Sequence, residues 1–155
     1  MAGQTKGASP TIVPSLIYQD PAAAIDWLEQ AFGFELSMMV KGPDGRPAHV
    51  ELTLGDALIY VGGDDWADCL GSPTALGGKN TQILNVTVDD ANAHHARAKK
   101  AGAKILAEPS DQFYGDRAYR ALDLEGHYWT FNQKIRTVSI ADMEKATGFK
   151  IEIRK

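Results

Sequence analysis

In the first third of the chain, the spacing of hydrophobic and polar residues predicts a strand, then a helix, then three more strands. Residues 11–18 are apolar and β-branched, and Asp20 and Pro21 then start a helix, because Asp is a good N-cap and Pro suits the first helical turn. Apolar residues recur at helical spacing up to Phe32, and Gly33 follows as a C-terminal cap. Three strand patterns separated by turn residues come next: 34–41, 48–54 and 57–61.

The same order of elements recurs 70 residues further along, where Asp90 takes the place of Asp20. A second helix pattern covers residues 90–101 and ends at Gly102. The strand patterns of this half are 82–88, 103–107, 117–122 and 127–132. A repeat of this kind predicts an α+β fold of two βαβββ modules, residues 11–61 and 82–133, whose strands form a curved mixed sheet.

Three segments lie outside the repeated elements. Residues 62–80 form a Gly- and Asp-rich linker between the modules, and Glu108–Asp116 is predicted to be a long loop. In the tail, residues 134–155, Ser139 is placed to cap a helix that runs to Thr147, and Phe149–Arg154 alternates like a strand. The length of 155 residues suits one domain, so we expect residues 1–155 to fold as a single domain with this helix and strand as an extension.

Strict alternation in residues 48–54 separates two kinds of side chain. His49 and Glu51 share one face of the strand, while Val50, Leu52 and Leu54 share the other. The apolar set is predicted to pack under the helix, which leaves His49 and Glu51 on the opposite face. Four interpretations of this pair stay open. The two side chains could form the polar wall of a binding pocket or act as an acid/base pair. They could also be two ligands of a metal site whose third ligand is missing from the sequence, or belong to a solvated surface.

Composition and charge narrow the range of partners. The formal net charge of −4 argues against nucleic acid as the main partner. The single cysteine, Cys69, cannot form an intrachain disulfide. No apolar stretch approaches the roughly 20 residues of a membrane span, and Met1–Pro10 lacks the apolar core of a signal peptide, so the sequence predicts a cytoplasmic protein without a membrane partner.

Three segments resemble the glyoxalase/bleomycin-resistance/dioxygenase superfamily, also called vicinal oxygen chelate. They are IVPSLIYQDPAAAIDWLEQAFGF (12–34), NVTVDDANAHHARAKKAGAKI (85–105) and YGDRAYRALDLEGHYWTF (114–131), and the resemblance extends over residues 11–133. It implies that the first and last strands of each module meet at a shared cup. It does not by itself imply one activity, because this fold hosts isomerases, dioxygenases, thiol transferases and drug-binding proteins.

In metal-dependent members of that superfamily, the resemblance implies one inward-facing ligand on each of those four strands. Carried over by position, the four places are occupied by Val13, Tyr60, Ile83 and Thr130. Val and Ile have no lone pairs to donate, and Thr and neutral Tyr are poor ligands for a divalent ion. The sequence therefore predicts no metal and no cofactor, as in a metal-free branch similar to the bleomycin-resistance proteins.

Three functional hypotheses follow from these observations. The first is a metal-free protein that binds a small organic molecule, including sequestration of a drug or metabolite. The second is a metal-independent isomerase or lyase with His49 and Glu51 as its acid/base pair, so whether the chain is an enzyme stays open. The third is a structural or interaction protein whose tail serves assembly. The candidate ligand-binding residues are Val13, His49, Glu51, Tyr60, Trp66, Ile83, Asn85, Tyr114, Arg117, Tyr128 and Thr130.

Two further expectations concern Arg117 and the state of assembly. Arg117 is either part of the mouth of the cup or a structural partner of a nearby aspartate, namely Asp111, Asp116 or Asp123. The apolar face formed by Phe149, Ile151 and Ile153 in the tail predicts a homodimer, because little of one domain is left to cover it. The resemblance implies the same, since chains of that superfamily often pair or swap modules.

Overall fold

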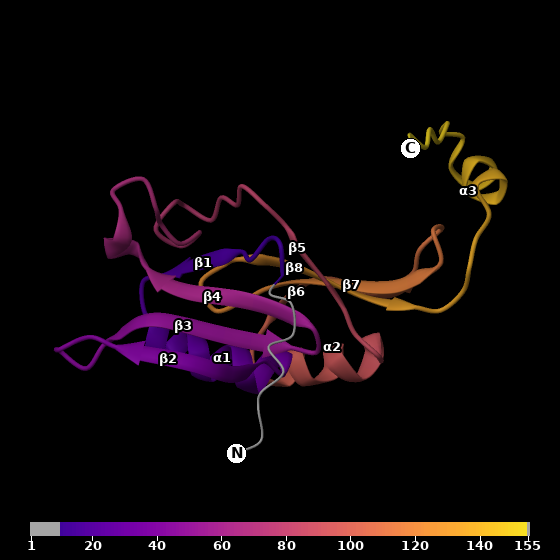
Figure 1. The fold of residues 1–155 in the computed structure, drawn as a ribbon. Helices are drawn as coiled ribbons and strands as arrows, with labels where there is room; N and C mark the ends of the chain where they lie inside the picture. The colour runs from indigo at the N-terminus through magenta and orange to yellow at the C-terminus, as the bar shows by residue number, and fades with distance from the viewer. Residues whose placement is uncertain (1–9, 155) are drawn as a thin grey trace, which may run out of the picture. The chain divides into compact units, whose positions relative to one another are not determined.

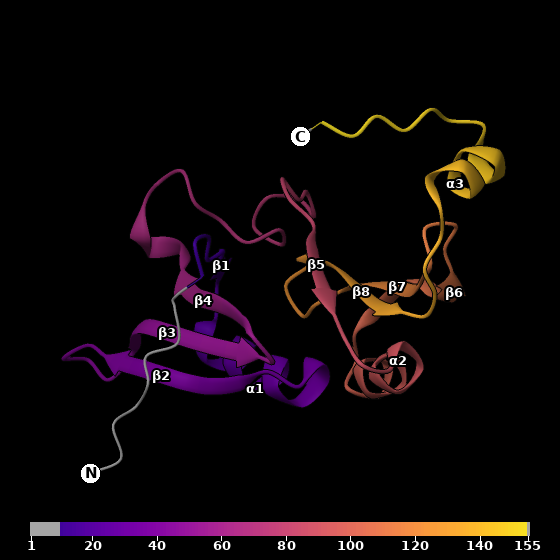
Figure 2. The same ribbon diagram turned by 45° about the vertical axis from the view of Figure 1, so that its right-hand side comes forward.

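The structure, a computed structural model, describes residues 10–154, so the prediction for Met1–Pro10 falls outside the described residues except at its last position. The chain divides into two compact units, the first ending at Lys79 and the second beginning at Asn80. Each unit holds a four-stranded sheet. Figures 1 and 2 show a helix lying against each sheet. We call these units the first and the second module.

The first module has the element order βαβββ, followed by a short 3-10 helix. Its elements are β1 (Ser15–Tyr18), α1 (Pro21–Phe32), β2 (Glu35–Lys41), β3 (Pro47–Leu54), β4 (Ala57–Gly63) and η1 (Asp64–Trp66). The sheet order is β1-β4-β3-β2, with β1 parallel to β4 and the other neighbours antiparallel. Helix α1 begins and ends where the sequence predicts, because Asp20 Oδ1 accepts a hydrogen bond from the Ala23 amide and Gly33 adopts a left-handed φ of 80°.

The second module repeats this topology. Its elements are β5 (Leu84–Thr87), α2 (Ala91–Lys100), β6 (Lys104–Asp111), β7 (Asp116–Leu122), β8 (Tyr128–Lys134) and α3 (Ile140–Thr147), and its sheet order is β5-β8-β7-β6. The strand register repeats as well. Ser15 lies opposite Tyr60 in the first sheet, and Asn85 lies opposite Thr130 in the second, each 70 residues later. The predicted pair of βαβββ modules is confirmed.

Each sheet has one face covered by its helix. In β3, Val50 and Leu52 are completely buried, while His49 and Glu51, which alternate with them, are partly exposed on the opposite side. The sequence predicted this alternation, and the structure confirms it. We call the side of each sheet that faces away from its helix the open face of that module.

Helix α2 contacts its sheet through histidines rather than through a wide apolar stripe. The buried residues of α2 are two small ones, Ala91 and Ala98. The helix is held by a polar contact instead, in which His94 Nδ1 lies 2.6 Å from the hydroxyl of Tyr119 on β7. Burial raises the pKa of that hydroxyl, so it stays protonated and available for hydrogen bonding. His95 Nε2 lies 2.7 Å from a carboxylate oxygen of Glu108 on β6, so the two adjacent histidines fix the helix at two points.

Three features differ from the sequence-based expectations. The strands form two four-stranded sheets, one in each module, where one sheet was expected. Strand β6 continues to Asp111 because Ser110 and Asp111 pair with β7, so the expected long loop shortens to residues 112–115. The tail forms the predicted helix α3, but residues 149–154 are not a strand, because no strand in the described part of the chain pairs with them.

Gly115, in the turn between β6 and β7, fixes the point at which the chain leaves β8. The amides of Ile135 and Arg136 both donate to the Gly115 carbonyl oxygen at 3.0 Å. The φ of Gly115 is 100°, and a Cβ at this position would collide with the carbonyl oxygen of Arg136. Only glycine satisfies both the left-handed backbone and this close approach.

We therefore predict that Gly115→Ala destabilises the protein by about 3 kcal/mol or more, through backbone strain and the collision together. Gly102→Ala is the matched control, because Gly102 has a similar φ of 94° but no atom within 4 Å of the added Cβ. This control should cost only about 1–2 kcal/mol, the cost of the left-handed backbone. Urea unfolding measures both, and equal losses for the two variants would contradict the proposed collision.

Candidate functional site

Three predicted site residues come together on the open face of the first module. His49 Nε2 lies 2.9 Å from Glu51 Oε1, and the ring of His49 stands edge-on to the ring of Tyr60 with the centroids 4.8 Å apart. Glu51 and Tyr60 are direct neighbours across β3 and β4. The sheet thus holds an imidazole between a carboxylate and an aromatic ring, which limits the orientations that His49 can adopt.

Strand β2 adds two apolar side chains to this face that the sequence reasoning missed. Met38 and Val40 lie opposite Glu51 and His49 in the register, and the exposed fractions of the two side chains are 49% and 50%. A register shift between Leu36 and Met38 interrupts the alternation of β2, so the sequence pattern alone does not assign these residues to a face. The open face of the first module is therefore an apolar and aromatic surface with one fixed polar pair.

The open face of the second module carries neutral polar groups and one arginine. Asn85 on β5, Thr130 on β8 and Arg120 on β7 form one row across the sheet. Tyr128 belongs to the same face, two residues before Thr130, and its amide donates to Asn80 Oδ1 at 3.1 Å. Asn80 also donates to the carbonyl oxygen of Gly126, so it ties the start of the second module to the β7–β8 turn.

Arg120 was not among the residues singled out from the sequence. Its neighbour Tyr119 is completely buried against α2, and successive residues of a strand point to opposite faces. Arg120 therefore belongs to the open face. Alternation along residues 117–122 could have assigned Arg120 to this face. That assignment depends on knowing that Tyr119 belongs to the core, which the sequence alone does not show.

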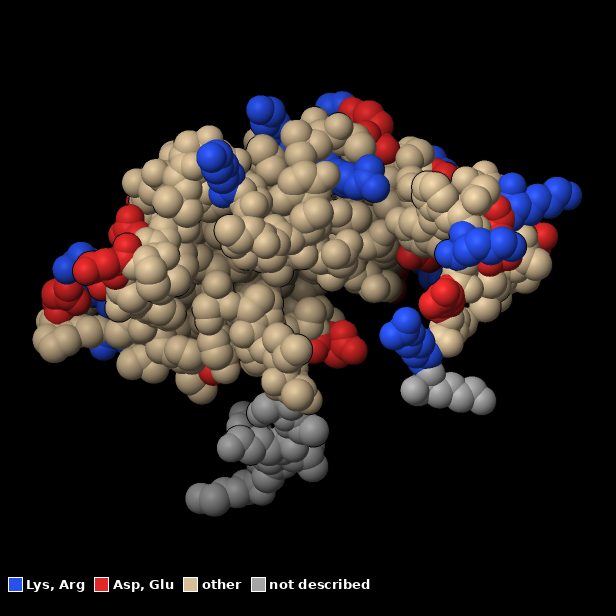
Figure 3. Space-filling view, turned by 90° about the horizontal axis from the view of Figure 1, so that it is seen from above, with Lys and Arg blue, Asp and Glu red and all other residues tan. Residues whose placement is uncertain are grey.

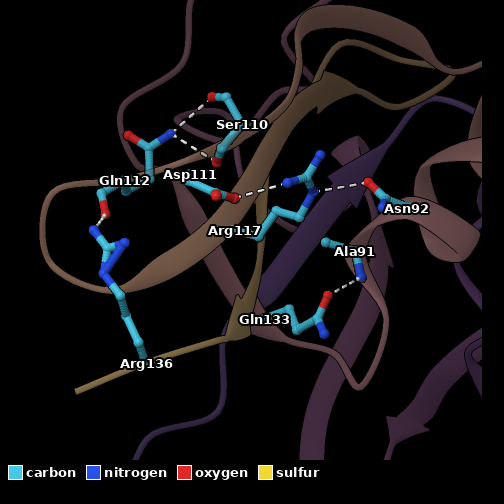
Figure 4. Close-up of polar contacts among 8 residues, drawn as sticks. All are labelled: Ala91, Asn92, Ser110, Asp111, Gln112, Arg117, Gln133 and Arg136. Carbon is cyan, nitrogen blue, oxygen red and sulfur yellow. Dashed lines mark hydrogen bonds and ion pairs between the residues drawn. The ribbon is translucent and has the colours of Figure 1, made fainter.

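Arg117 lies on the helix side of the second sheet, as Figure 4 shows. Its Nε donates to Asn92 at the start of α2, and its Nη1 lies 2.7 Å from Asp111 Oδ1. In the same region Gln133 accepts a hydrogen bond from the Ala91 amide. Arg117 thus has the structural role of joining β7, β6 and α2, with Asp111 as the partner among the three aspartates considered.

Trp66 lies in η1, with its ring against Gly62. A Cβ on Gly62 would lie 2.5 Å from the indole ring, so this packing requires glycine. Trp66 also lines a pocket of about 470 Å³ at the end of the first sheet, where β4 ends and α1 begins. Figure 3 shows acidic side chains gathered at the left-hand end of the view, which is the end where Figure 1 draws η1 and the β2–β3 turn. The charged residues lining this pocket are Asp20, Asp44, Arg46, Asp64 and Asp65.

Asp44 and Arg46 form an ion pair across the β2–β3 turn, with Arg46 Nε 2.6 Å from Asp44 Oδ2. The hydrogen bond from the Arg46 side chain lowers the pKa of the Asp44 carboxyl. Both side chains are largely exposed, so this pair contributes little to stability.

The remaining predicted site residues lie at the ends of strands or in turns. Val13 lies two residues before the start of β1, and Ile83 lies directly before the start of β5. The ring of Tyr114 packs edge-on against Phe113 in the turn of residues 112–115. Of the predicted set, the structure brings His49, Glu51 and Tyr60 together in the first module, and it places Asn85, Tyr128 and Thr130 on one face of the second.

The residues at the four positions implied by the resemblance do not fit a metal ion. Val13 and Ile83 carry no donor atom, and the Tyr60 ring is packed against His49. In residues 10–154 no three His, Cys, Asp or Glu side chains are grouped so that they could hold a metal ion. The imidazole and the carboxylate on the open face of the first module are those of His49 and Glu51, which are two potential ligands and not three.

Comparison with known proteins places this fold in a family. The model of the glyoxalase/bleomycin resistance protein/dioxygenase superfamily matches residues 11–131, which span both modules. The chain belongs to this superfamily. This confirms the resemblance stated from the sequence at the level of the superfamily.

An uncharacterized protein of Mycobacterium tuberculosis strain H37Rv is 34% identical over 140 residues, covering 88% of this chain and 82% of that protein. An uncharacterized protein of Mycobacterium bovis is also 34% identical over 140 residues, and the match covers 88% of this chain and 91% of that protein.

Among solved structures, TioX from Micromonospora sp. ML1 is 32% identical to this superfamily member, with a TM-score of 0.66 over 80% of this chain and 98% of TioX. TnmS3 from Streptomyces sp. CB03234, described as an antibiotic binding protein, is 20% identical with a TM-score of 0.62, over 83% and 99% of the two chains. The likeness to TnmS3 shows the fold alone. Within residues 10–154, no helix has the length and apolar character needed to cross a membrane.

Proposed function

We propose that this member of the superfamily is a metal-free protein that reversibly binds a small, largely apolar organic molecule. The observation that carries the proposal is the open face of the first module, where Met38, Val40 and Tyr60 surround the His49–Glu51 pair. Apolar and aromatic walls with a few oriented polar groups are the usual composition of a small-molecule site. Asn85, Tyr128 and Thr130 are proposed as a separate set of ligand contacts on the open face of the second module.

The fold shared with TnmS3 is compatible with this proposal, since that protein is described as antibiotic binding. Sequestration of a drug or metabolite in the cytoplasm is the biological role we propose. Val13 is retained as an apolar contact of the first module and Ile83 as one of the second. Trp66, Tyr114 and Arg117 are left out of the proposed site, because their side chains pack against Gly62, Phe113 and the Asn92–Asp111 pair respectively.

A second candidate function is a metal-independent isomerase or lyase. The specific observation in its favour is the 2.9 Å contact between His49 and Glu51, because a carboxylate that orients an imidazole is a common arrangement for a general base. In this case a substrate proton would pass to His49, and Glu51 would hold the ring and stabilise its charged form. Turnover that is lost in His49→Gln but unaffected by chelator would favour this candidate over simple binding.

For the proposed site, we predict that a thermal-shift screen of flat, neutral, fused-ring aromatic compounds yields ligands that stabilise the protein reversibly. Tyr60→Ala should weaken their binding by about threefold to tenfold, because ring stacking contributes roughly 0.5–1.5 kcal/mol. Tyr114→Ala is the matched control, since its ring packs on Phe113 in a turn. Isothermal titration measures the affinities. Equal losses in the two variants, or a screen without any ligand, would contradict the proposed site.

For the metal, we predict that the purified protein contains no stoichiometric zinc, nickel, manganese or iron, and that chelator leaves its melting temperature unchanged. The reason is that Val13, Tyr60, Ile83 and Thr130 occupy the positions where metal-dependent relatives are expected to carry their ligands. Elemental analysis tests this directly. One tightly bound divalent ion per chain would refute the metal-free proposal.

For assembly, we propose a homodimer in which the tail is covered by the partner. Phe149 and Ile153 are 72% and 71% exposed, and exposed apolar side chains of this size favour association. Light scattering at micromolar concentration should give twice the mass of one chain, and the double variant Phe149→Ser/Ile153→Ser should give the mass of a monomer. A wild-type monomer would rule out the homodimer, and a dimeric double variant would rule out the role of the tail.

A further inference from the structure

Arg120 is half-buried at the middle of the open face of the second module. Its guanidinium has no ionic or hydrogen-bonding partner among residues 10–154. Other arginines of the described chain are paired. Arg117 contacts Asp111 and Asn92, and Arg46 contacts Asp44. A partly buried guanidinium without a carboxylate is unfavourable for folding, because its loss of hydration is not offset. No ion pair or hydrogen bond among the described residues therefore accounts for the position of the Arg120 guanidinium.

Among the described residues, those that pair with Arg120 across the second sheet carry no negative charge. The residues across the sheet, Thr130 and then Asn85, are neutral. Asp116 lies on the same strand four residues away, about 13 Å along it, and its carboxylate is 3.6 Å from the Lys134 ammonium. Lys104, at the β6 edge of the same face, is a second cation. The open face of the second module thus presents positive charge beside neutral hydrogen-bonding groups.

We infer that the open face of the second module, taken by itself, binds an organic molecule that carries a carboxylate or a comparable oxyanion on a flat apolar body, and that Arg120 binds this group. This inference rests on the proposed function and specifies the class of ligand. The planar fork of a guanidinium matches the two oxygens of a carboxylate, and the partial burial of Arg120 strengthens such a pair relative to one in water. The Thr130 hydroxyl and the Asn85 amide, in the same row, supply neutral donors for the remaining lone pairs of the anion.

The test compares naphthoic acid with naphthamide, which have the same ring system but differ in charge at neutral pH. Isothermal titration of the full-length wild type should show about tenfold or more tighter binding of the acid, as expected for a charge-assisted hydrogen bond. Arg120→Gln should remove this preference and leave the affinity for naphthamide within about twofold, while Arg120→Lys should retain part of it. Arg117→Gln, on the same strand but the other face, should retain the full preference.

The outcomes separate the inference from the proposed function. If the wild type binds both compounds equally, or if Arg120→Gln leaves the preference for the acid intact, the role of Arg120 is refuted while small-molecule binding stands. If the wild type binds neither naphthoic acid nor naphthamide, and the neutral aromatic screen also yields no ligand, the proposed function fails and the inference fails with it. If the wild type prefers the acid and Arg120→Gln removes this preference while Arg117→Gln retains it, the role of Arg120 is supported.

Discussion

Each sheet of this protein has four strands and one long helix, so the helix can cover only one of its two faces. Because side chains alternate along a strand, this constraint divides every strand into a buried set and an open set. In β3 the buried set is Val50 and Leu52, and the open set is His49 and Glu51. The core of each module and its candidate site are therefore two sides of the same strands.

The division explains which substitutions the fold tolerates. Tyr119, Trp129 and Phe131 are completely buried and fix the second sheet to α2, so they are unavailable for binding. Side chains of the open set contribute less to the free energy of folding, so their residue types can vary with the function of the protein. At the positions where the resemblance implies metal ligands, this chain has Val13 and Tyr60 in its first module, and we propose that these side chains contact a ligand instead.

Much of this architecture could be predicted from the sequence. The 70-residue repeat predicted two modules and the equivalence of Tyr60 and Thr130, which lie opposite Ser15 and Asn85 in matching registers. Alternation in β3 placed His49 and Glu51 on a common face. These predictions succeeded because periodicity and caps are local properties of the chain.

Other features depend on pairing that the sequence does not show. The register shift before Met38 brings Met38 and Val40 beside His49 and Glu51, and no local pattern marks it. Strand β6 extends to Asp111 because β7 offers it partners, whereas the alternating segment 149–154 has none and forms no strand. The roles of Arg117 and Arg120 depended on which face of β7 lies against α2.

The central claim, that the open face of the first module binds a small organic molecule, is tested most directly by an amide chemical-shift titration with naphthamide. The account predicts saturable shifts concentrated at β3 and β4 around His49 and Tyr60. It also predicts that α1, α2 and the tail stay largely unchanged. Saturable shifts confined to the helices or to residues 134–154, or shifts that never saturate, would contradict it.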